Sequence, residues 1–160
     1  GADASEEMLK IAQKKHSEKE FFQAKSNDLP FEKESFQGCL TFHFIMHLDE
    51  VIFTKTIDEV HRILSKNGTF VFDIPVKNRR KIINQNQENW HAALSFNQDE
   101  IEKFIKNKFE IRKKFGLLII PIHRIPKRFR KYFLTFDFLL SNFGLLKNLS
   151  SYHIYELRKI

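Results

Sequence analysis

The sequence predicts a layered α/β fold with a mostly parallel sheet, built as a single domain. Two observations lead to this prediction. Strand-like apolar runs alternate with helix-like amphipathic segments, and the 160 residues suffice for one hydrophobic core but are few for two domains. Apolar residues make up 42% and charged residues 29%, the balance of a soluble globular protein, and Phe is unusually frequent at 18 residues.

The first predicted element is a helix over 5–15. Ser5 is a good N-cap, and Glu6 and Glu7 follow it where the helix dipole favours anions. Met8 begins an apolar stripe at helical spacing. The chain therefore enters a well-capped helix within its first residues.

Strands and a second helix are expected over the next segments. A short strand is predicted at 20–24 and a buried one at 38–44, where GCLTFHF is rich in aromatic and other β-favouring residues. A helix over 51–65 follows, and Gly68 suits the left-handed residue that ends it. The run TFVFDI then predicts a strand over 69–74.

The C-terminal half contains further helix and strand signals. Asn97 and Glu100 form a capping-box-like start to a helix that ends near Lys106. Weak alternation predicts a strand over 109–114, and the clear alternation of SYHIYELRK predicts the last strand over 151–159.

The positive charge of the chain is unevenly placed. Lys and Arg outnumber Asp and Glu by 27 to 20, a net charge of +7, and residues 101–131 alone hold 11 basic and two acidic residues. Such a cluster attracts phosphate, nucleic acid or an anionic membrane surface, and a solvated basic face is the plain alternative. Nucleic acid is the less favoured partner, because the aromatic residues here follow helical spacing rather than a strand platform for base stacking.

Composition also bounds the compartment. No apolar run reaches the roughly 18–20 residues that span a bilayer. Cys39 is the single cysteine, which rules out an internal disulfide and fits a reducing compartment, and its mid-strand position suits the core. We therefore expect a cytoplasmic protein.

Four stretches in the first 75 residues, in order and at suitable spacing, resemble the class I S-adenosylmethionine-dependent methyltransferases of the small-molecule type. GADASEEML resembles the second strand and following helix of that family, and FFQAKSNDLPFEKESF its third strand and LPF loop. CLTFHFIMHL resembles the fourth strand, and EVHRILSKNGTFVFDIP the helix, turn and strand after it. The resemblance implies a Rossmann-like layered sheet with an antiparallel C-terminal strand, and S-adenosyl-L-methionine as the cofactor.

The same resemblance divides the single domain into three regions. Residues 1–75 form a cofactor-side half, residues 76–150 a variable substrate or lid region, and residues 151–160 the final strand. The C-terminal half matches the family only in layout.

The expected cofactor site lies at strand ends. In open α/β sheets ligands bind outside the carboxyl ends of the strands, where an acidic side chain can accept hydrogen bonds from both hydroxyls of a ribose. Asp3 stands at such an end, and the plain alternative is a turn former before the helix. The resemblance implies the other cofactor-binding positions, which are Ala4, Met8, Lys25, Ser26, Thr41 and Phe42.

Two residues depart from the family pattern at this site. Family members often carry an Asp that accepts from the adenine amino group where this chain has Lys25, which can only donate. Gln37 replaces an acidic residue of the family. Because both replace an acidic residue of the family, we expect both to lower the affinity for the cofactor.

The glycine-rich loop of the family, between its first strand and first helix, has no counterpart here. The glycines form no GxGxG pattern; they are Gly1, Gly38, Gly68, Gly116 and Gly144. We therefore expect an N-terminally truncated domain that lacks the first strand and helix, with a gap one strand wide. Buried backbone groups at the gap would each cost about 1–3 kcal/mol. Such a fragment should bind the cofactor weakly or not at all, unless a missing N-terminal segment or a dimer completes the sheet.

Candidate catalytic and substrate residues follow from position. Methyl transfer from a sulfonium depends on alignment and exclusion of water, and it needs a general base only for a poor nucleophile. His43 is the candidate base, and His47, Trp90 and His91 are candidate substrate contacts; a structural or surface role is the plain alternative for each. No further carboxylate–histidine pairing and no tight cluster of metal ligands is visible, so we expect no metal.

The stretch 126–149 repeats aromatic and leucine residues at three- and four-residue steps, and basic residues crowd its start. Three interpretations stay open: a core helix, a hydrophobic lid over a lipid-like acceptor, or an interfacial helix drawn to anionic lipid. The leading functional hypothesis is a methyltransferase acting on a small or lipid-like acceptor. The alternative is a non-catalytic protein of this fold that binds a membrane surface or a protein partner through this stretch.

Overall fold

The computed structural model describes residues 1–77, 95–120 and 125–160. Its helices are α1 (Glu6–Lys15), α2 (Glu50–Ile63), α4 (Gln98–Ile105) and α5 (Lys127–Asn142), with 3₁₀ turns η1 (Ile45–His47) and η3 (Gly144–Leu149). Its strands are β1 (Ala2–Asp3), β2 (Phe22–Gln23), β3 (Phe36–Thr41), β4 (Leu64–Pro75), β5 (Phe109–Leu117) and β6 (Tyr152–Lys159).

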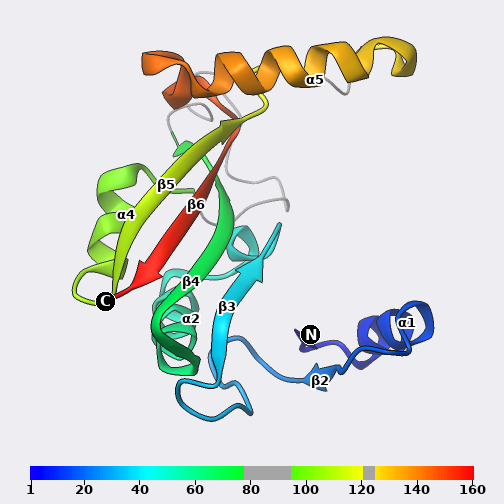
Figure 1. The fold of residues 1–160 in the computed structure, drawn as a ribbon, viewed down its shortest axis with the longest axis vertical. Helices are drawn as coiled ribbons and strands as arrows, with labels where there is room; N and C mark the ends of the chain where they lie inside the picture. The colour runs from blue at the N-terminus through cyan, green and yellow to red at the C-terminus, as the bar shows by residue number, and fades with distance from the viewer. Residues whose placement is uncertain (78–94, 121–124) are drawn as a thin grey trace.

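The described strands form two separate sheets (Figure 1). β1 and β2 pair in parallel, and a four-stranded sheet has the order β3-β4-β6-β5. β3 and β4 pair in parallel, whereas β6 is antiparallel to both β4 and β5. Within the larger sheet three strands therefore share one direction and the last strand opposes them. This confirms the predicted α/β fold with a mostly parallel sheet and an antiparallel C-terminal strand.

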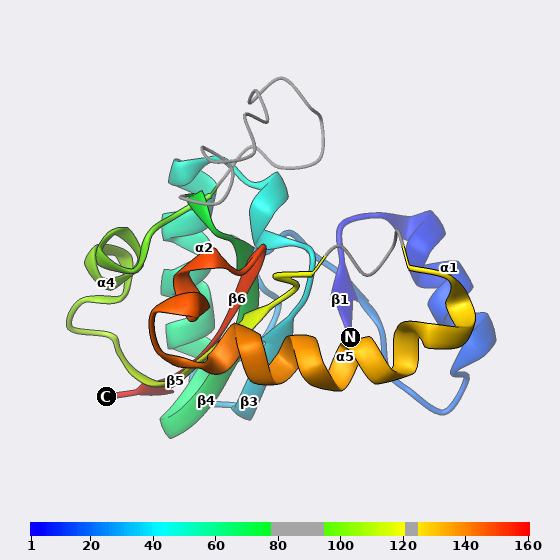
Figure 2. The same ribbon diagram turned by 90° about the horizontal axis from the view of Figure 1, so that it is seen from above.

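The hydrophobic core lies between one face of the larger sheet and the helices α2 and α4 (Figures 1 and 2). Its centre is aromatic: Phe53 of α2 meets Phe72 of β4 edge-on, with ring centroids 6.3 Å apart. Phe72 in turn stacks on Tyr155 of β6 at 5.5 Å. All three side chains are fully buried, and each contributes about 1.5–3 kcal/mol through burial. Part of the high Phe content is thus used in this core.

The start of α1 agrees with its sequence signal, whereas the end of α2 does not. Ser5 Oγ accepts from the backbone N–H of Met8 at 3.3 Å, as expected of an N-cap. α2 ends at Ile63 and passes directly into β4, and the left-handed residue is Asn67, with a φ of 65°, which lies inside β4 where its pairing with β3 is irregular. The role predicted for Gly68 was wrong. A Cβ there would lie 2.8 Å from the carbonyl oxygen of Ser65, so this glycine permits close backbone approach.

Other element boundaries shift by a few residues. β3 ends at Thr41, three residues before the predicted end of the strand, and β5 continues to Leu117. The capping-box start of α4 holds, since Glu100 Oε2 accepts from the backbone N–H of Asn97 at 2.7 Å. Cys39 packs against the core as expected, and burial raises the pKa of its thiol to about 11.

The aromatic stretch 126–149 folds as α5 followed by η3, and the core-helix interpretation was wrong. The buried residues of α5 are polar, Asp137 and Ser141, while most of its aromatic side chains are exposed. α5 crosses the end of the larger sheet, next to the carboxyl end of β5 (Figure 1). Among the described residues, no helix combines the length and the apolar character needed to cross a bilayer.

Candidate functional site

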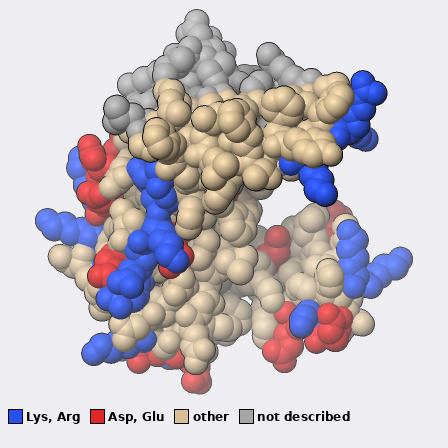
Figure 3. All heavy atoms as spheres, turned by 45° about the horizontal axis from the view of Figure 1, so that its top comes forward, with Lys and Arg blue, Asp and Glu red and all other residues tan. Residues whose placement is uncertain are grey.

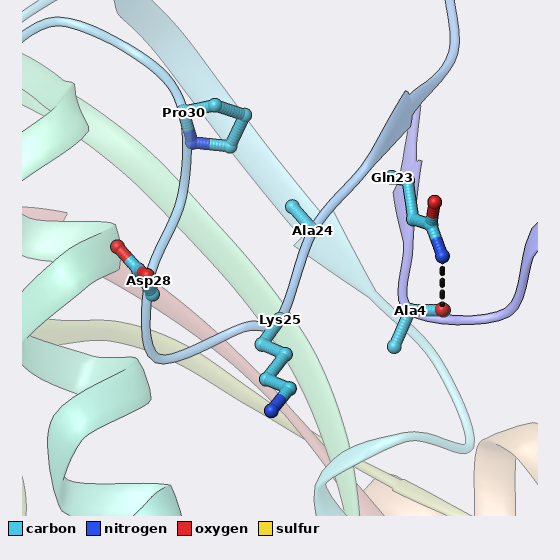
Figure 4. A pocket seen from close by; sticks show the side chains of 6 residues that line it. All are labelled: Ala4, Gln23, Ala24, Lys25, Asp28 and Pro30. Carbon is cyan, nitrogen blue, oxygen red and sulfur yellow. Dashed lines mark hydrogen bonds between the residues drawn. The ribbon is translucent and has the colours of Figure 1, made fainter.

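The carboxyl ends of β1 and β2 border an open pocket of about 440 Å³ (Figure 4). The pocket is lined by Ala4, Gln23, Ala24, Lys25, Asp28 and Pro30. Gln23 fixes the distance between the two strand ends, because its Nε2 donates to the carbonyl oxygen of Ala4 at 3.2 Å. Of the predicted cofactor residues, Ala4 and Lys25 line this pocket.

Asp3 is the last residue of β1 and immediately precedes the pocket-lining Ala4. Its Oδ1 accepts from the backbone N–H of Ser5 at 2.8 Å, so the carboxylate also shapes the turn into α1. Its Oδ2 has no hydrogen-bond partner among the described residues. The turn-forming role is therefore observed for Oδ1, and the ribose-binding role remains a prediction for which Oδ2 is available at the strand end.

Lys25 begins a tight turn after β2. The backbone N–H of Asp28 donates to the carbonyl oxygen of Lys25 at 3.0 Å, which closes the turn. The two side chains point apart in Figure 4, and no ion pair joins them in the part of the chain that the structure describes. Lys25 therefore presents its ammonium group at the pocket without a neutralising partner from this turn.

The LPF loop is anchored to α2 by a residue pair that sequence analysis missed. Glu59 Oε2 accepts from the backbone N–H of Leu29 at 2.8 Å, and Arg62 Nε donates to Glu59 Oε1 at 2.7 Å. Arg62 also donates to the carbonyl oxygens of Phe31, at 2.7 Å, and of Leu29, at 3.0 Å. The hydrogen bond from Arg62 holds the pKa of the Glu59 carboxyl below its usual value.

The pair rigidifies one wall of the pocket, since Pro30 lies between the two anchored carbonyls. Its sequence signal is the spacing Glu59-x-x-Arg62 on a helix, which places both side chains on one face. The spacing alone does not predict which loop packs against this face of α2.

The side chain of Ser26 is committed to α2 rather than to the pocket. Its Oγ lies 2.8 Å from Thr56 Oγ1, and Thr56 donates its own hydroxyl proton to the carbonyl oxygen of Ile52 at 2.8 Å. Ser26 therefore donates its hydroxyl proton to Thr56. The predicted cofactor role of Ser26 cannot rest on donation by its side chain in this arrangement.

A buried carboxylate holds the candidate base. The backbone N–H of His43 donates to Asp73 Oδ1 at 2.7 Å, and the Nδ1 of His43 lies 3.5 Å from Asp73 Oδ2. Asp73 is 5% exposed, whereas the His43 side chain is 70% exposed. The ring of Tyr152 meets the His43 ring edge-on at 5.5 Å. The imidazole is thus oriented from one side and open on the other.

Asp73 was not identified from the sequence as the partner of His43. Asp73 lies 30 residues from His43 in sequence, and the two meet because β3 and β4 are neighbours. A signal was present, since Asp73 is the acidic residue in the otherwise apolar run TFVFDI. The backbone of His43 is also left-handed, with a φ of 52°, which turns the chain at the end of β3.

The remaining predicted residues do not line the pocket. Thr41 ends β3 and Phe42 follows it half-exposed, while Met8 is 54% exposed on α1 and His47 is exposed in η1. The predicted substrate residues Trp90 and His91 lie outside the described residues. Among those described, no group of His, Cys, Asp and Glu side chains could hold a metal ion.

In the class of open α/β folds, ligands bind outside the carboxyl ends of the strands, and the pocket and the histidine–carboxylate pair both lie at such ends. Comparison with known proteins narrows the class. Residues 1–72 match the family model described as a methyltransferase domain. No curated protein matches the chain in sequence.

Solved structures with a similar fold include two methyltransferases and a cyclase. A SAM-dependent methyltransferase from Thermotoga maritima, described as a possible histamine N-methyltransferase, aligns over 100% of this chain and 72% of its own, with a TM-score of 0.73 and 18% identity. A SAM-dependent methyltransferase from Methanosarcina mazei aligns over 100% of this chain and 81% of its own, with a TM-score of 0.69 and 15% identity. The [4+2]-cyclase SpnF aligns over 99% of this chain and 64% of its own, with a TM-score of 0.68 and 15% identity.

The N-terminal 72 residues of this protein therefore carry a methyltransferase domain signature, and the chain as a whole has the fold of the class I S-adenosylmethionine-dependent methyltransferases. Two of these neighbours are described as SAM-dependent. The cyclase shows that the fold also supports other chemistry, so the acceptor and the reaction have to be argued from the site.

Proposed function

We propose that this chain carries the ribose-binding and acceptor-activating residues of a cytoplasmic S-adenosylmethionine-dependent methyltransferase that acts on a small or lipid-like acceptor. One observation carries the proposal: Asp3 ends β1 beside the pocket, with Oδ1 fixed by Ser5 and Oδ2 free. A carboxylate oriented in this way is suited to accept hydrogen bonds from the hydroxyls of the cofactor's ribose.

Some polar groups at the pocket suit the adenosyl part of the cofactor, and Lys25 does not suit the adenine amino group. Asp3 supplies an acceptor for the ribose, and the Ala4 backbone and Gln23 keep the two strand ends at a fixed separation. Lys25 adds donors only, so it cannot accept from the adenine amino group. When bound, the cofactor supplies an electrophilic methyl group on a positively charged sulfur.

His43 is suited to remove a proton from the methyl acceptor. A neutral imidazole whose Nδ1 carries the proton toward Asp73 presents Nε2 as the proton acceptor. The buried carboxylate of Asp73 then stabilises the imidazolium that forms when Nε2 takes up the proton. General-base catalysis of this kind contributes about 10²–10⁴-fold to a rate.

The ribose site is tested by titrating the ¹⁵N-labelled chain with S-adenosylhomocysteine and following backbone amide shifts. We expect shifts at Ala4, Gln23 and Lys25, and affinity about tenfold lower in Asp3→Asn, because one charge-assisted hydrogen bond is lost. Glu7→Gln is the matched control, since it removes an exposed carboxylate four residues away on α1. Shifts that spare the pocket, or that are unchanged by Asp3→Asn, would refute the site.

The role of His43 is tested by methyl transfer to a panel of small amines, phenols and lipid-like acceptors. His43→Gln should lower turnover at least about tenfold while S-adenosylhomocysteine affinity stays the same. His61→Gln is the control, because His61 is a partly buried histidine of α2. Equal turnover in His43→Gln and the unmodified chain would remove His43 from the mechanism.

We further propose that the described chain forms part of a larger domain, and that a preceding segment adds one strand between β1 and β3. The split into a two-stranded and a four-stranded sheet supports this, as does the position of β3 at one edge of the larger sheet, where its outer side pairs with no described strand. The neighbours named above are also longer than this chain. The 160-residue chain should therefore bind S-adenosylhomocysteine weakly; a micromolar dissociation constant by isothermal titration would contradict this part of the proposal.

A second candidate function is a non-catalytic protein that keeps this fold. The specific observation in its favour is Lys25, which replaces an acceptor by a donor at the pocket. Absence of pocket shifts in the titration, together with no methyl transfer to any acceptor, would favour this alternative.

A further inference from the structure

The helix α5 is oriented with polar side chains toward the protein and aromatic side chains toward solvent. We propose that this surface, defined by the aromatic stripe and basic end described below, docks the protein onto a membrane rich in anionic phospholipid. The inference goes beyond methyl transfer and does not depend on it.

Polar contacts fix which side of α5 faces the sheet. Asp137 is 2% exposed and accepts from the backbone N–H groups of Leu118, at 2.9 Å, and Ile120, at 2.7 Å. At the C-terminal end of the helix, Asn142 accepts from the backbone N–H of Gly116 at 3.0 Å and donates to its carbonyl oxygen at 3.2 Å. These specific bonds hold the helix in one rotation about its axis, because any other rotation leaves several of these groups unpaired.

The side of α5 that faces away from the sheet carries an exposed aromatic stripe. Four residues at helical spacing form it: Tyr132, Phe136, Leu139 and Phe143. They are 73%, 54%, 64% and 74% exposed, respectively. Tyr132, Phe136 and Leu139 lie four and three positions apart and so share one face of α5, and Phe143 continues the stripe at the C-terminal cap of the helix. An exposed apolar face of this kind marks an interaction surface.

Basic side chains gather at the N-terminal end of the same helix. They are Lys127, Arg128, Arg130 and Lys131, and Figure 3 shows Lys and Arg side chains at the end of an uncharged band along α5. Cations at a helix N-terminus oppose the helix dipole, so this placement does not serve the helix itself. Lys127 and Lys131 form no ion pair with any described residue.

Charge decides between a membrane and a second copy of the chain. Asp137 is the sole acidic residue between Leu117 and Tyr155, and it is buried and fully engaged with the protein. Two copies meeting through this surface would bring like charges together, whereas anionic lipid headgroups would neutralise them. Aromatic and leucine side chains beside lysines and arginines also suit the interface between headgroups and acyl chains.

The position of α5 connects this surface with the candidate active site. α5 is bonded to the last residues of β5 and to those that follow it, at the end of the larger sheet where β3 also finishes (Figure 1). A membrane that contacts α5 would therefore lie beyond the carboxyl ends of these strands. An acceptor drawn from the bilayer surface would reach the rim of the sheet from that side.

The experiment is vesicle co-sedimentation of the intact chain with phosphatidylcholine alone and with phosphatidylcholine containing phosphatidylglycerol. We expect binding to the anionic vesicles, and a partition coefficient that falls as the salt concentration rises. Lys127→Gln/Lys131→Gln should weaken this binding about 10- to 30-fold, since each basic residue near an anionic surface contributes several-fold. Lys55→Gln/Lys66→Gln is the matched control for net charge and should bind within about twofold of the unmodified chain.

The aromatic stripe is tested separately. Phe136→Ser/Phe143→Ser should lower binding at least about tenfold, while Val51→Ser/Ile160→Ser, which replaces equally exposed apolar residues elsewhere, should leave it unchanged. Tyr132→Trp should show fluorescence quenching by brominated lipid, and Val51→Trp should not. Circular dichroism confirms that each variant remains folded.

Three outcomes would overturn the proposal. The first is the absence of binding to anionic vesicles. The second is binding that the α5 variants leave unchanged. The third is a dimer in analytical ultracentrifugation that dissociates in the α5 variants and ignores vesicles, which would assign the surface to a second copy of the chain. None of these readouts involves the cofactor, so they are independent of the outcome for methyl transfer.

Discussion

Asp137→Ala should release α5 from the sheet. The carboxylate of Asp137 accepts two backbone N–H groups, from Leu118 and Ile120, and a weaker bond from Ser141 Oγ at 3.3 Å. Leu118 also holds a left-handed backbone, with a φ of 61°, a conformation that costs a residue with a side chain about 1–3 kcal/mol. The bond to Asp137 helps to keep it there.

The magnitude follows from these contacts. Removing the carboxylate loses two charge-assisted hydrogen bonds and leaves two N–H groups without acceptors, so Asp137→Ala should cost about 3–5 kcal/mol. Asp137→Asn keeps one acceptor oxygen but turns an amide donor toward the second N–H, and should cost about 1–3 kcal/mol. Ser141→Ala removes the long bond alone and should cost about 1 kcal/mol or less.

Native-state hydrogen exchange measures the effect where it occurs. The free energy of opening reported by the Leu118 and Ile120 amides should decrease least in Ser141→Ala, more in Asp137→Asn and most in Asp137→Ala. Amides of β4 should change less, because their bonds are made to β3 and β6. If the Leu118 and Ile120 amides exchange in Asp137→Ala as slowly as in the unmodified chain, the carboxylate does not hold the helix and the reasoning fails.

Three further predictions concern side chains in the body of the protein. Burial, with Lys114 and Lys147 nearby, lowers the pKa of His153 from 6.5 to about 4. Between pH 4 and pH 6.5 this histidine is therefore protonated in the unfolded chain but neutral in the folded chain. The free energy of unfolding should therefore fall by up to about 3 kcal/mol as the pH drops from 6.5 to 4, and urea titrations of His153→Gln should show a smaller fall. Arg62→Ala should accelerate exchange of the Leu29 amide at least about tenfold, since Glu59 loses the guanidinium that orients it; no change would separate this ion pair from the loop. Tyr155→Phe should raise the free energy of unfolding by about 1 kcal/mol, because the buried hydroxyl has no partner among the described residues; a loss of stability in urea would contradict this.

Local signals in the sequence were sufficient where the structure depends on neighbouring residues. The Ser5 cap, the acidic first turn of α1 and the capping-box start of α4 all form as their spacing indicates. β6 buries every second residue, as the alternation of SYHIYELRK requires. The position of Asp3 at a strand end agrees with the resemblance of GADASEEML to the second strand and following helix of the methyltransferases. Such features are decided within a few residues, so reading the chain in order finds them.

The tertiary structure alone decided which faces and which distant residues meet. Helical periodicity identified an apolar stripe in α5 but could not tell whether the sheet would cover it. Asp137 and Asn142 turn the opposite side inward by bonding backbone groups at the end of β5 and just after it. His43 and Asp73 come together because parallel pairing aligns the ends of β3 and β4, and that pairing crosses 30 residues of sequence. Contacts of this kind depend on how elements pack, and packing is a property of the folded chain rather than of any short segment.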